Sequence, residues 1–110
     1  MKIKINGLVW AVKNEDAGHP DLQNSRGNPC FGVTDYTKQT ITLRNDMSKE
    51  LYRQTVAHEL LHAYTFSFGV HLFADEETEE PVADFIGAHI DKIWEHTNKI
   101  CNELFGKGVK

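Results

Sequence analysis

The fold is decided by one helical stretch, TVAHELLHAYTFSF, which runs from Thr55 to Phe68. Ser48 is a good N-cap upstream, and no glycine or proline follows it before Gly69, so we expect a helix of about twenty residues. A helical wheel places on one side Leu51, Thr55, His58, Glu59, His62 and Phe66. It places on the other side Val56, Ala57, Leu60, Leu61, Tyr64 and Phe68. The histidine face is therefore expected to differ from the core face.

Within this helix, His58-Glu59-Leu60-Leu61-His62 has the spacing HExxH. Two histidines four residues apart lie one turn apart on the same helix face, so both imidazoles can bind one tetrahedral Zn²⁺. The intervening carboxylate would lie beside the metal, where it can accept a proton from a bound water molecule. The motif predicts a zinc site with His58 and His62 as ligands and Glu59 as the base.

A catalytic zinc site of this kind needs a third protein ligand, which in the His₂Glu class is a glutamate further along the chain. Glu80 opens the next predicted helix, and Asp84 lies one turn later on the same face. We expect Glu80 to bind the metal and Asp84 to accept the N–H of a ligand histidine. The small residues Gly87 and Ala88 extend this face and would let the two helices approach closely. A solvated acidic helix start, stabilised by the helix dipole, explains Glu76, Glu77 and Glu79.

The remaining chain predicts a small sheet and a second helix. Lys2 to Val12 is expected to be a short strand with a turn or bulge at Asn6-Gly7, and 14–29, rich in Gly, Asn and Pro, is expected to be a loop. Cys30 to Arg44 is expected to form a hairpin. A long helix should begin at Thr78 or Glu79 and continue well past His96. The predicted fold class is α+β, with a three-stranded antiparallel or mixed sheet packed on two helices.

Several residues outside the motif have simpler explanations. Trp10 and Trp94 are expected in the core, and His89 is expected to pack rather than bind metal. Cys30 and Cys101 are far apart in sequence and lack the spacing of a cysteine zinc site, so we expect two reduced thiols.

Length and composition limit the classes of protein to consider. With 110 residues, 40% hydrophobic and 25% charged, the chain is expected to form one domain spanning residues 1–110. A net charge of -4 with scattered Lys and Arg argues against nucleic acid as a partner. The apolar runs are shorter than a bilayer span, and the start resembles no signal peptide, so we expect a cytoplasmic protein that does not bind membranes.

The combination of HELLH at 58–62 and EPVAD at 80–84 resembles the gluzincin zinc metallopeptidases. Within that group the chain is most similar to minigluzincins and to the ImmA/IrrE-like peptidases of phages and mobile elements, over roughly Phe31 to Ala88. The resemblance implies a zinc-dependent endopeptidase with a minimal zincin core. It also implies an active-site helix with His58, Glu59 and His62, and a glutamate helix with Glu80 and Asp84. Leu61 departs from the family pattern, since many ImmA-like proteins have Gly there.

The predicted activity is hydrolysis of peptide bonds in a peptide or protein substrate, with Glu59 transferring the proton of a zinc-activated water to the leaving amine. His71 is the best candidate for an oxyanion donor by its position, although a surface histidine is the simpler explanation of this residue. Two alternatives remain open. One is a non-catalytic binding module in which zinc only stabilises the fold. The other is a latent peptidase whose cleft is covered by the tail 101–110 or the loop 14–29, or whose zinc is blocked by a cysteine. The sequence does not indicate the oligomeric state.

Overall fold

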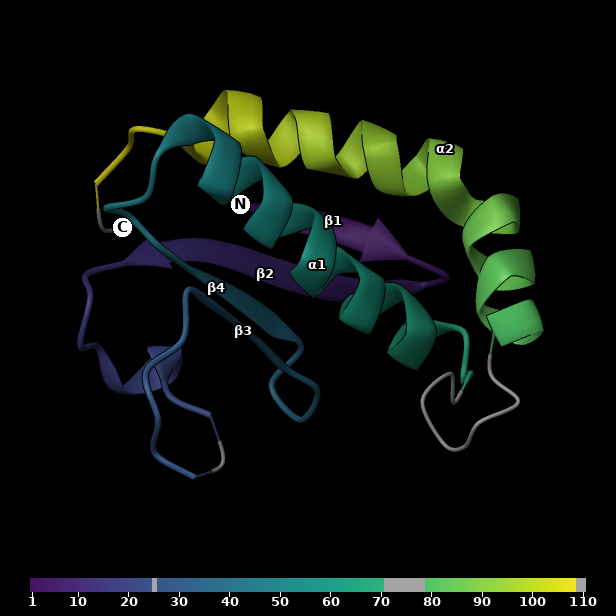
Figure 1. Ribbon diagram of the computed structural model, residues 1–110, viewed down its shortest axis with the longest axis horizontal. Helices are drawn as coiled ribbons and strands as arrows, with labels where there is room; N and C mark the ends of the chain where they lie inside the picture. Colours follow the sequence, from purple (N-terminus) through teal and green to yellow (C-terminus); the bar gives the residue numbers. More distant parts are fainter. Residues whose placement is uncertain (25, 71–78, 109–110) are drawn as a thin grey trace.

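A four-stranded mixed sheet covered by two helices forms the protein (Figure 1). The computed structural model describes residues 1–24, 26–70 and 79–108, without the side chains of 79–81. The sheet has the strand order β1-β2-β4-β3. Its elements, in chain order, are β1 (Lys2–Ile5), β2 (Leu8–Glu15), the short 3₁₀ helix η1 (Pro20–Leu22), β3 (Gly32–Asp35), β4 (Thr40–Arg44), α1 (Lys49–Ser67) and α2 (Glu79–Leu104).

The N-terminal segment is a hairpin of two strands, not the single strand expected from the sequence. Asn6 and Gly7 both have positive φ, 46° and 85°. Strands β1 and β2 pair antiparallel, with Ile5 opposite Leu8 next to the turn and Lys2 opposite Ala11 at the far end. Positive φ at both central residues is typical of the type I′ turn, for which Asn-Gly is the preferred sequence. This turn adds the fourth strand, so the prediction of three strands is wrong.

Strand β2 also extends further than expected, because it pairs in parallel with β4 as far as Glu15–Arg44. Asn14 is buried, 1% exposed, and its amide donates to the main-chain oxygens of Leu104, the last residue of α2, and of Lys107, which follows the helix. The segment from 14 to 29 is therefore not all loop: its first two residues belong to the sheet. Within it, η1 buries Leu22 and packs against β3 and β4.

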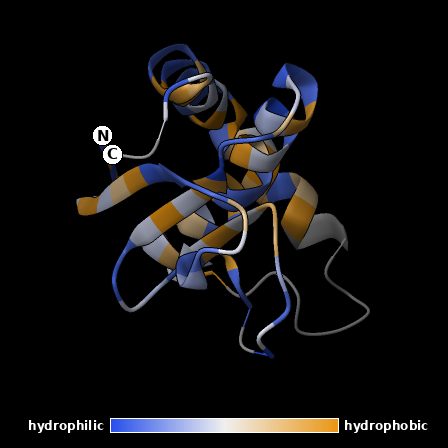
Figure 2. Ribbon diagram, turned by 90° about the vertical axis from the view of Figure 1, so that its left-hand side faces the viewer, coloured by the Kyte–Doolittle hydropathy of each residue, from blue (hydrophilic) through white to orange (hydrophobic). Residues whose placement is uncertain are grey.

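The predicted hairpin from Cys30 to Arg44 is confirmed as β3 and β4, paired antiparallel from Gly32–Leu43 to Asp35–Thr40. Strand β3 lies at the edge of the sheet. Both helices lie on one face of the sheet (Figures 1 and 2), and α1 crosses closest to β3 and β4. This arrangement leaves β3 beside the middle of α1.

Helix α1 begins at the predicted cap, where the Ser48 side chain accepts from the main-chain N–H of Leu51. Its core face buries Val56, Leu60 and Tyr64, and the buried indole of Trp10 donates to Ser67 Oγ at 2.9 Å. The apolar core combines this face with Tyr52 and Ala63 of the same helix, with Met47 just before it, and with residues of the sheet and α2: Ile3, Ile5, Trp10, Val12, Ile41, Leu43, Phe85, Ile93, Ile100 and Leu104. The prediction of separate histidine and core faces is confirmed.

Helix α2 is long, as predicted, and its inner stripe buries Phe85, Ile93, Thr97, Ile100 and Leu104. Trp94 does not belong to the core, because it follows Ile93 and so lies about 100° further around the helix. Its side chain is 55% exposed, with the guanidinium carbon of Arg53 4.4 Å from the ring centre.

No helix in the described ranges is long and apolar enough to span a membrane.

His89 and His96 of α2 both contact α1. His89 packs against the rings of Phe68 and Phe85, with centroid distances of 4.3 and 4.5 Å, which confirms its predicted packing role. His96 Nδ1 lies 2.6 Å from the hydroxyl oxygen of Tyr64, a group whose pKa is raised to about 12 by burial and the charge of Glu95. The phenol therefore stays protonated and can donate to a neutral His96.

We expect the metal-free protein to lose stability as the pH falls below about 6.5, with His96 as one cause. Burial and the nearby Lys99 and Lys92 lower the pKa of His96 from 6.5, against the opposing charge of Glu95. The unfolded chain then binds a proton that folded His96 resists, so acidification favours unfolding from pH 6.5 down through the folded pKa. Thermal melts with a chelator present should show that the Tm falls less between pH 7.5 and pH 5.5 for His96→Gln than for the wild type. An equal drop in both proteins would contradict this assignment.

Candidate metal and catalytic site

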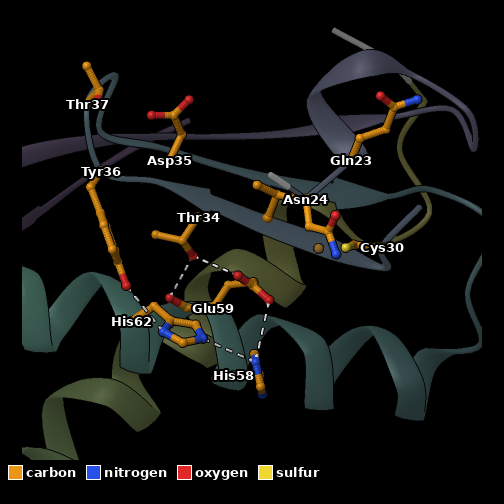
Figure 3. Close-up of a pocket in the computed structure, with 12 residues that line it drawn as sticks. Gln23, Asn24, Cys30, Thr34, Asp35, Tyr36, Thr37, His58, Glu59 and His62 are labelled. Carbon is orange, nitrogen blue, oxygen red and sulfur yellow. Dashed lines mark hydrogen bonds and ion pairs between the residues drawn. The ribbon is translucent and has the colours of Figure 1, made fainter. Parts of the chain in front are cut away.

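A pocket of about 580 Å³ opens between the edge strand β3 and the exposed face of α1 (Figure 3). It contains all three residues of the HExxH motif that carry chemistry. Its walls come from the η1–β3 segment, the β3–β4 hairpin and α1, and consist of Gln23, Asn24, Cys30, Gly32, Val33, Thr34, Asp35, Tyr36, Thr37, His58, Glu59 and His62.

His58 and His62 present the same ring nitrogen to one point in space. Their Nε2 atoms lie 3.3 Å apart, although the rings are tilted by 69° to each other. Two nitrogens bound to one tetrahedral Zn²⁺ at about 2.0–2.1 Å would be separated by about 3.3–3.4 Å. The separation of the two imidazoles therefore fits a shared zinc ion.

Glu59 extends from α1 toward the same pocket but is almost fully enclosed, with 8% of its side chain exposed. Thr34 Oγ1 of β3 lies 2.8 Å from Glu59 Oε1 and 3.1 Å from its main-chain oxygen, so the hydroxyl donates to this residue. Glu59 Oε2 lies 3.9 Å from Nε2 of His58. Burying a carboxylate costs free energy unless pairing or hydrogen bonds compensate it. One oxygen is thus held by the sheet while the other borders the histidines.

Gly32 gives the Glu59 side chain its space. A Cβ at Gly32 would lie 2.7 Å from Thr55 Cγ2 and 3.0 Å from Glu59 Cγ, closer than ordinary van der Waals contact. The strand can therefore approach the helix this closely only with glycine at position 32.

Tyr36, which the sequence analysis did not single out, also belongs to the site. Its hydroxyl oxygen lies 3.4 Å from Nδ1 of His62 (Figure 3). Its ring stacks on that of Phe66, with a centroid distance of 4.8 Å. Burial and the negative charge of Glu59 raise the pKa of Tyr36, which keeps it a neutral phenol. The alternation along 32, 34 and 36 was the available signal, because it places Tyr36 on the same side as Thr34.

The structure does not test the remaining predicted site residues. His71 lies outside the described residues, and so does the side chain of Glu80, although its backbone belongs to the first turn of α2. Asp84 is exposed on α2, and its hydrogen bond to a ligand histidine stays a prediction. Among side chains in the described part of the chain, no set of three or more His, Cys, Asp or Glu is placed to hold a metal ion. The side chain of Glu80, the predicted third ligand, is not covered by this statement, because it lies outside the described residues.

The contact between the two helices differs from the one expected. Gly87 and Ala88 are exposed, and a Cβ at Gly87 would meet nothing within 4 Å. Small residues at these positions therefore do not bring the helices together. Phe85, His89 and His96 make the contact instead, through the aromatic side chains Tyr64 and Phe68 of α1.

The two segments considered as covers for the cleft differ in position. The tail packs near the N-terminal end of α1, where the ring of Phe105 lies 5.3 Å from that of Tyr52. The segment before β3 contributes Gln23, Asn24 and Cys30 to the pocket wall. Cys30 and Cys101 are both free thiols, as expected. Among the described residues of the two candidate covers, those of the 14–29 segment, together with its neighbour Cys30, border the pocket.

Comparison with other proteins adds no assignment. No protein family, curated protein or solved structure matches this chain.

Proposed function

We propose that the protein is a zinc-dependent endopeptidase in which His58 and His62 bind the metal and Glu59 is the general base. Glu80 is the proposed third ligand, and Asp84 the proposed partner of a ligand histidine. The observation that carries the proposal is the 3.3 Å separation of the two Nε2 atoms beside a buried carboxylate. When bound, zinc would supply the Lewis acidity that activates water and polarises a peptide carbonyl.

The chain's own residues would then move the proton. Glu59 takes it from a water molecule in the pocket and returns it to the departing amine, so one carboxylate serves as base and then acid. Thr34 holds Oε1 at 2.8 Å, which leaves Oε2 toward the histidines. This fixed orientation supports a catalytic role over a purely structural zinc site, since a structural site has four protein ligands and needs no base.

The position of the pocket favours a peptide as the substrate. Residues 32–37 all line it, and β3 is one of the two edge strands of the described sheet. An edge strand has main-chain N–H and C=O groups available to pair with an extended peptide. A peptide lying along β3 would pass directly in front of Glu59 and the two histidines.

We expect the purified protein to contain about one zinc per chain. His58→Ala and His62→Ala should lose most of the metal and the zinc-dependent cleavage of an unfolded protein such as casein. Removing zinc from the wild type should lower its Tm, because a ligand present at about 1,000 times its Kd adds about 4 kcal/mol to the free energy of unfolding. Elemental analysis, a cleavage assay and thermal melts measure these effects.

His19→Ala is the matched control, since His19 caps η1 and does not line the pocket. It should retain zinc and cleavage. Stoichiometric zinc in both His58→Ala and His62→Ala would show that the ligand assignment is wrong. Zinc binding by a wild type that cleaves no peptide would contradict the proposed endopeptidase activity and favour the binding-module or the latent alternative.

A further inference from the structure

The β3–β4 turn brings a phenol to the outer side of the metal-binding histidine pair. Nε2 of His62 faces His58, and Nδ1, on the opposite side of the ring, is 3.4 Å from the Tyr36 hydroxyl oxygen. A neutral imidazole carries its proton on only one nitrogen, and metal binding needs the other nitrogen to be unprotonated. Zinc binding through Nε2 therefore requires the proton of His62 to reside on Nδ1.

We infer that Tyr36 is a positioning residue for His62, with its phenol oxygen accepting the Nδ1–H of that ligand. This inference rests on the proposed function, since it assigns a role relative to the zinc site. A hydrogen bond to the outer nitrogen of a ligand histidine fixes both its tautomer and its ring orientation. Such partners are usually carboxylates, main-chain carbonyls or water. In this protein a tyrosine takes their place.

The ring of Tyr36 is held in place by stacking on a second aromatic ring. It stacks nearly parallel on Phe66, with an interplanar angle of 6°, and Phe66 lies one turn after His62 on the same helix face. Phe66 in turn packs edge-on against Trp10, whose ring is fully buried. The position of Tyr36 therefore depends on the core through one intermediate aromatic ring.

The turn that carries Tyr36 is fixed to the rest of the sheet. The main-chain N–H of Lys38 donates to Asp35 Oδ1. Gln39 has a positive φ of 53°, and its carbonyl oxygen accepts from the main-chain N–H of Ala11 in β2. The Gln39 side chain also donates to the carbonyl of Val9 at 3.2 Å. A turn anchored in this way limits the movement of the phenol relative to α1.

The test compares Tyr36→Phe, which keeps the ring but removes the oxygen, with the wild type. Zinc affinity is measured by competition with a chromophoric chelator, and the His62 tautomer by ¹⁵N NMR of the metal-free protein. We expect about tenfold weaker zinc binding, the lower end of the effect of removing such a partner. We also expect the proton of His62 to redistribute from Nδ1 toward Nε2. Phe66→Leu, which keeps the oxygen but removes the stacking surface, should weaken zinc binding less.

Lys38→Ala is the control, because it changes the same turn while keeping the main-chain N–H that bonds to Asp35. It should bind zinc as the wild type does. Unchanged zinc affinity and an unchanged tautomer in Tyr36→Phe would overturn the role of Tyr36 while leaving the zinc site intact. A wild type that binds no zinc would overturn the proposed function instead, and the tautomer measurement would then still decide whether Tyr36 orients His62.

Discussion

Glu59→Gln is expected to abolish most peptide hydrolysis while leaving zinc content and fold unchanged. The amide keeps the shape of the side chain and can still accept the hydrogen bond that Thr34 makes to Oε1, but it cannot take a proton from water. Positioned acid–base groups typically contribute about 10²- to 10⁴-fold to a rate, so kcat should fall by an amount in that range. The measurement is the rate of casein cleavage at equal zinc content, with the melting curve as a check on folding.

Glu50→Gln provides the matched control for this prediction. Glu50 is an exposed glutamate in the first turn of the same helix and lines no part of the pocket. It should cleave at the wild-type rate. Undiminished cleavage by zinc-loaded Glu59→Gln would remove Glu59 from the mechanism.

Gly32→Ala is expected to damage both stability and turnover through a single added methyl group. The new Cβ would approach Thr55 Cγ2 to 2.7 Å and Glu59 Cγ to 3.0 Å, so strand, helix or side chains must move. Overpacking of this kind costs typically 1–3 kcal/mol. Because a catalytic group displaced by about 1 Å can lose about 10²-fold in rate, we expect kcat to fall at least about tenfold.

A second substitution separates the two effects of Gly32→Ala. Thr55→Ser removes Cγ2 but keeps the hydroxyl that donates to the main-chain oxygen of Leu51. Added to Gly32→Ala, it should restore part of the stability, measured by urea unfolding, but little of the turnover, because the contact with Glu59 remains. Gly87→Ala is the control: its Cβ meets nothing within 4 Å, so it should stabilise α2 by about 0.5–1 kcal/mol. A Gly32→Ala protein with wild-type stability and rate would show that the close approach of β3 is not needed.

Local signals predicted the helices and the second hairpin well, because these elements depend on interactions close in sequence. Ser48 caps α1 through its own side chain, and the β-rich runs around Thr34 and Ile41 pair across a short turn. The type I′ signal of Asn6-Gly7 was also present, but the segment was interpreted as one strand with a turn or bulge in it, not as two strands. The parallel pairing of β2 with β4 could not be predicted locally, because its partners are about thirty residues apart.

Burial within α2 shows a second limit of prediction from the sequence. Ile93 and Trp94 are adjacent and both apolar, so hydrophobicity alone places them together in the core. The crossing of α2 over α1 and the sheet decides which of the two faces inward, and Trp94 is left 55% exposed beside Arg53. Trp10, in contrast, lies on the inward side of an alternating strand and is fully buried.

The sequence by itself determined the pairing of His58 and His62, because four residues of helix necessarily bring two side chains to one face. It also determined that Glu59 lies between them. Only the tertiary structure decided what surrounds these groups. Strand β3 supplies Thr34 to the carboxylate and Tyr36 to the outer side of His62, and Gly32 admits the Glu59 side chain. Contacts between residues about 25 positions apart depend on how a strand docks against a helix, which packing of the whole chain sets and no local spacing encodes.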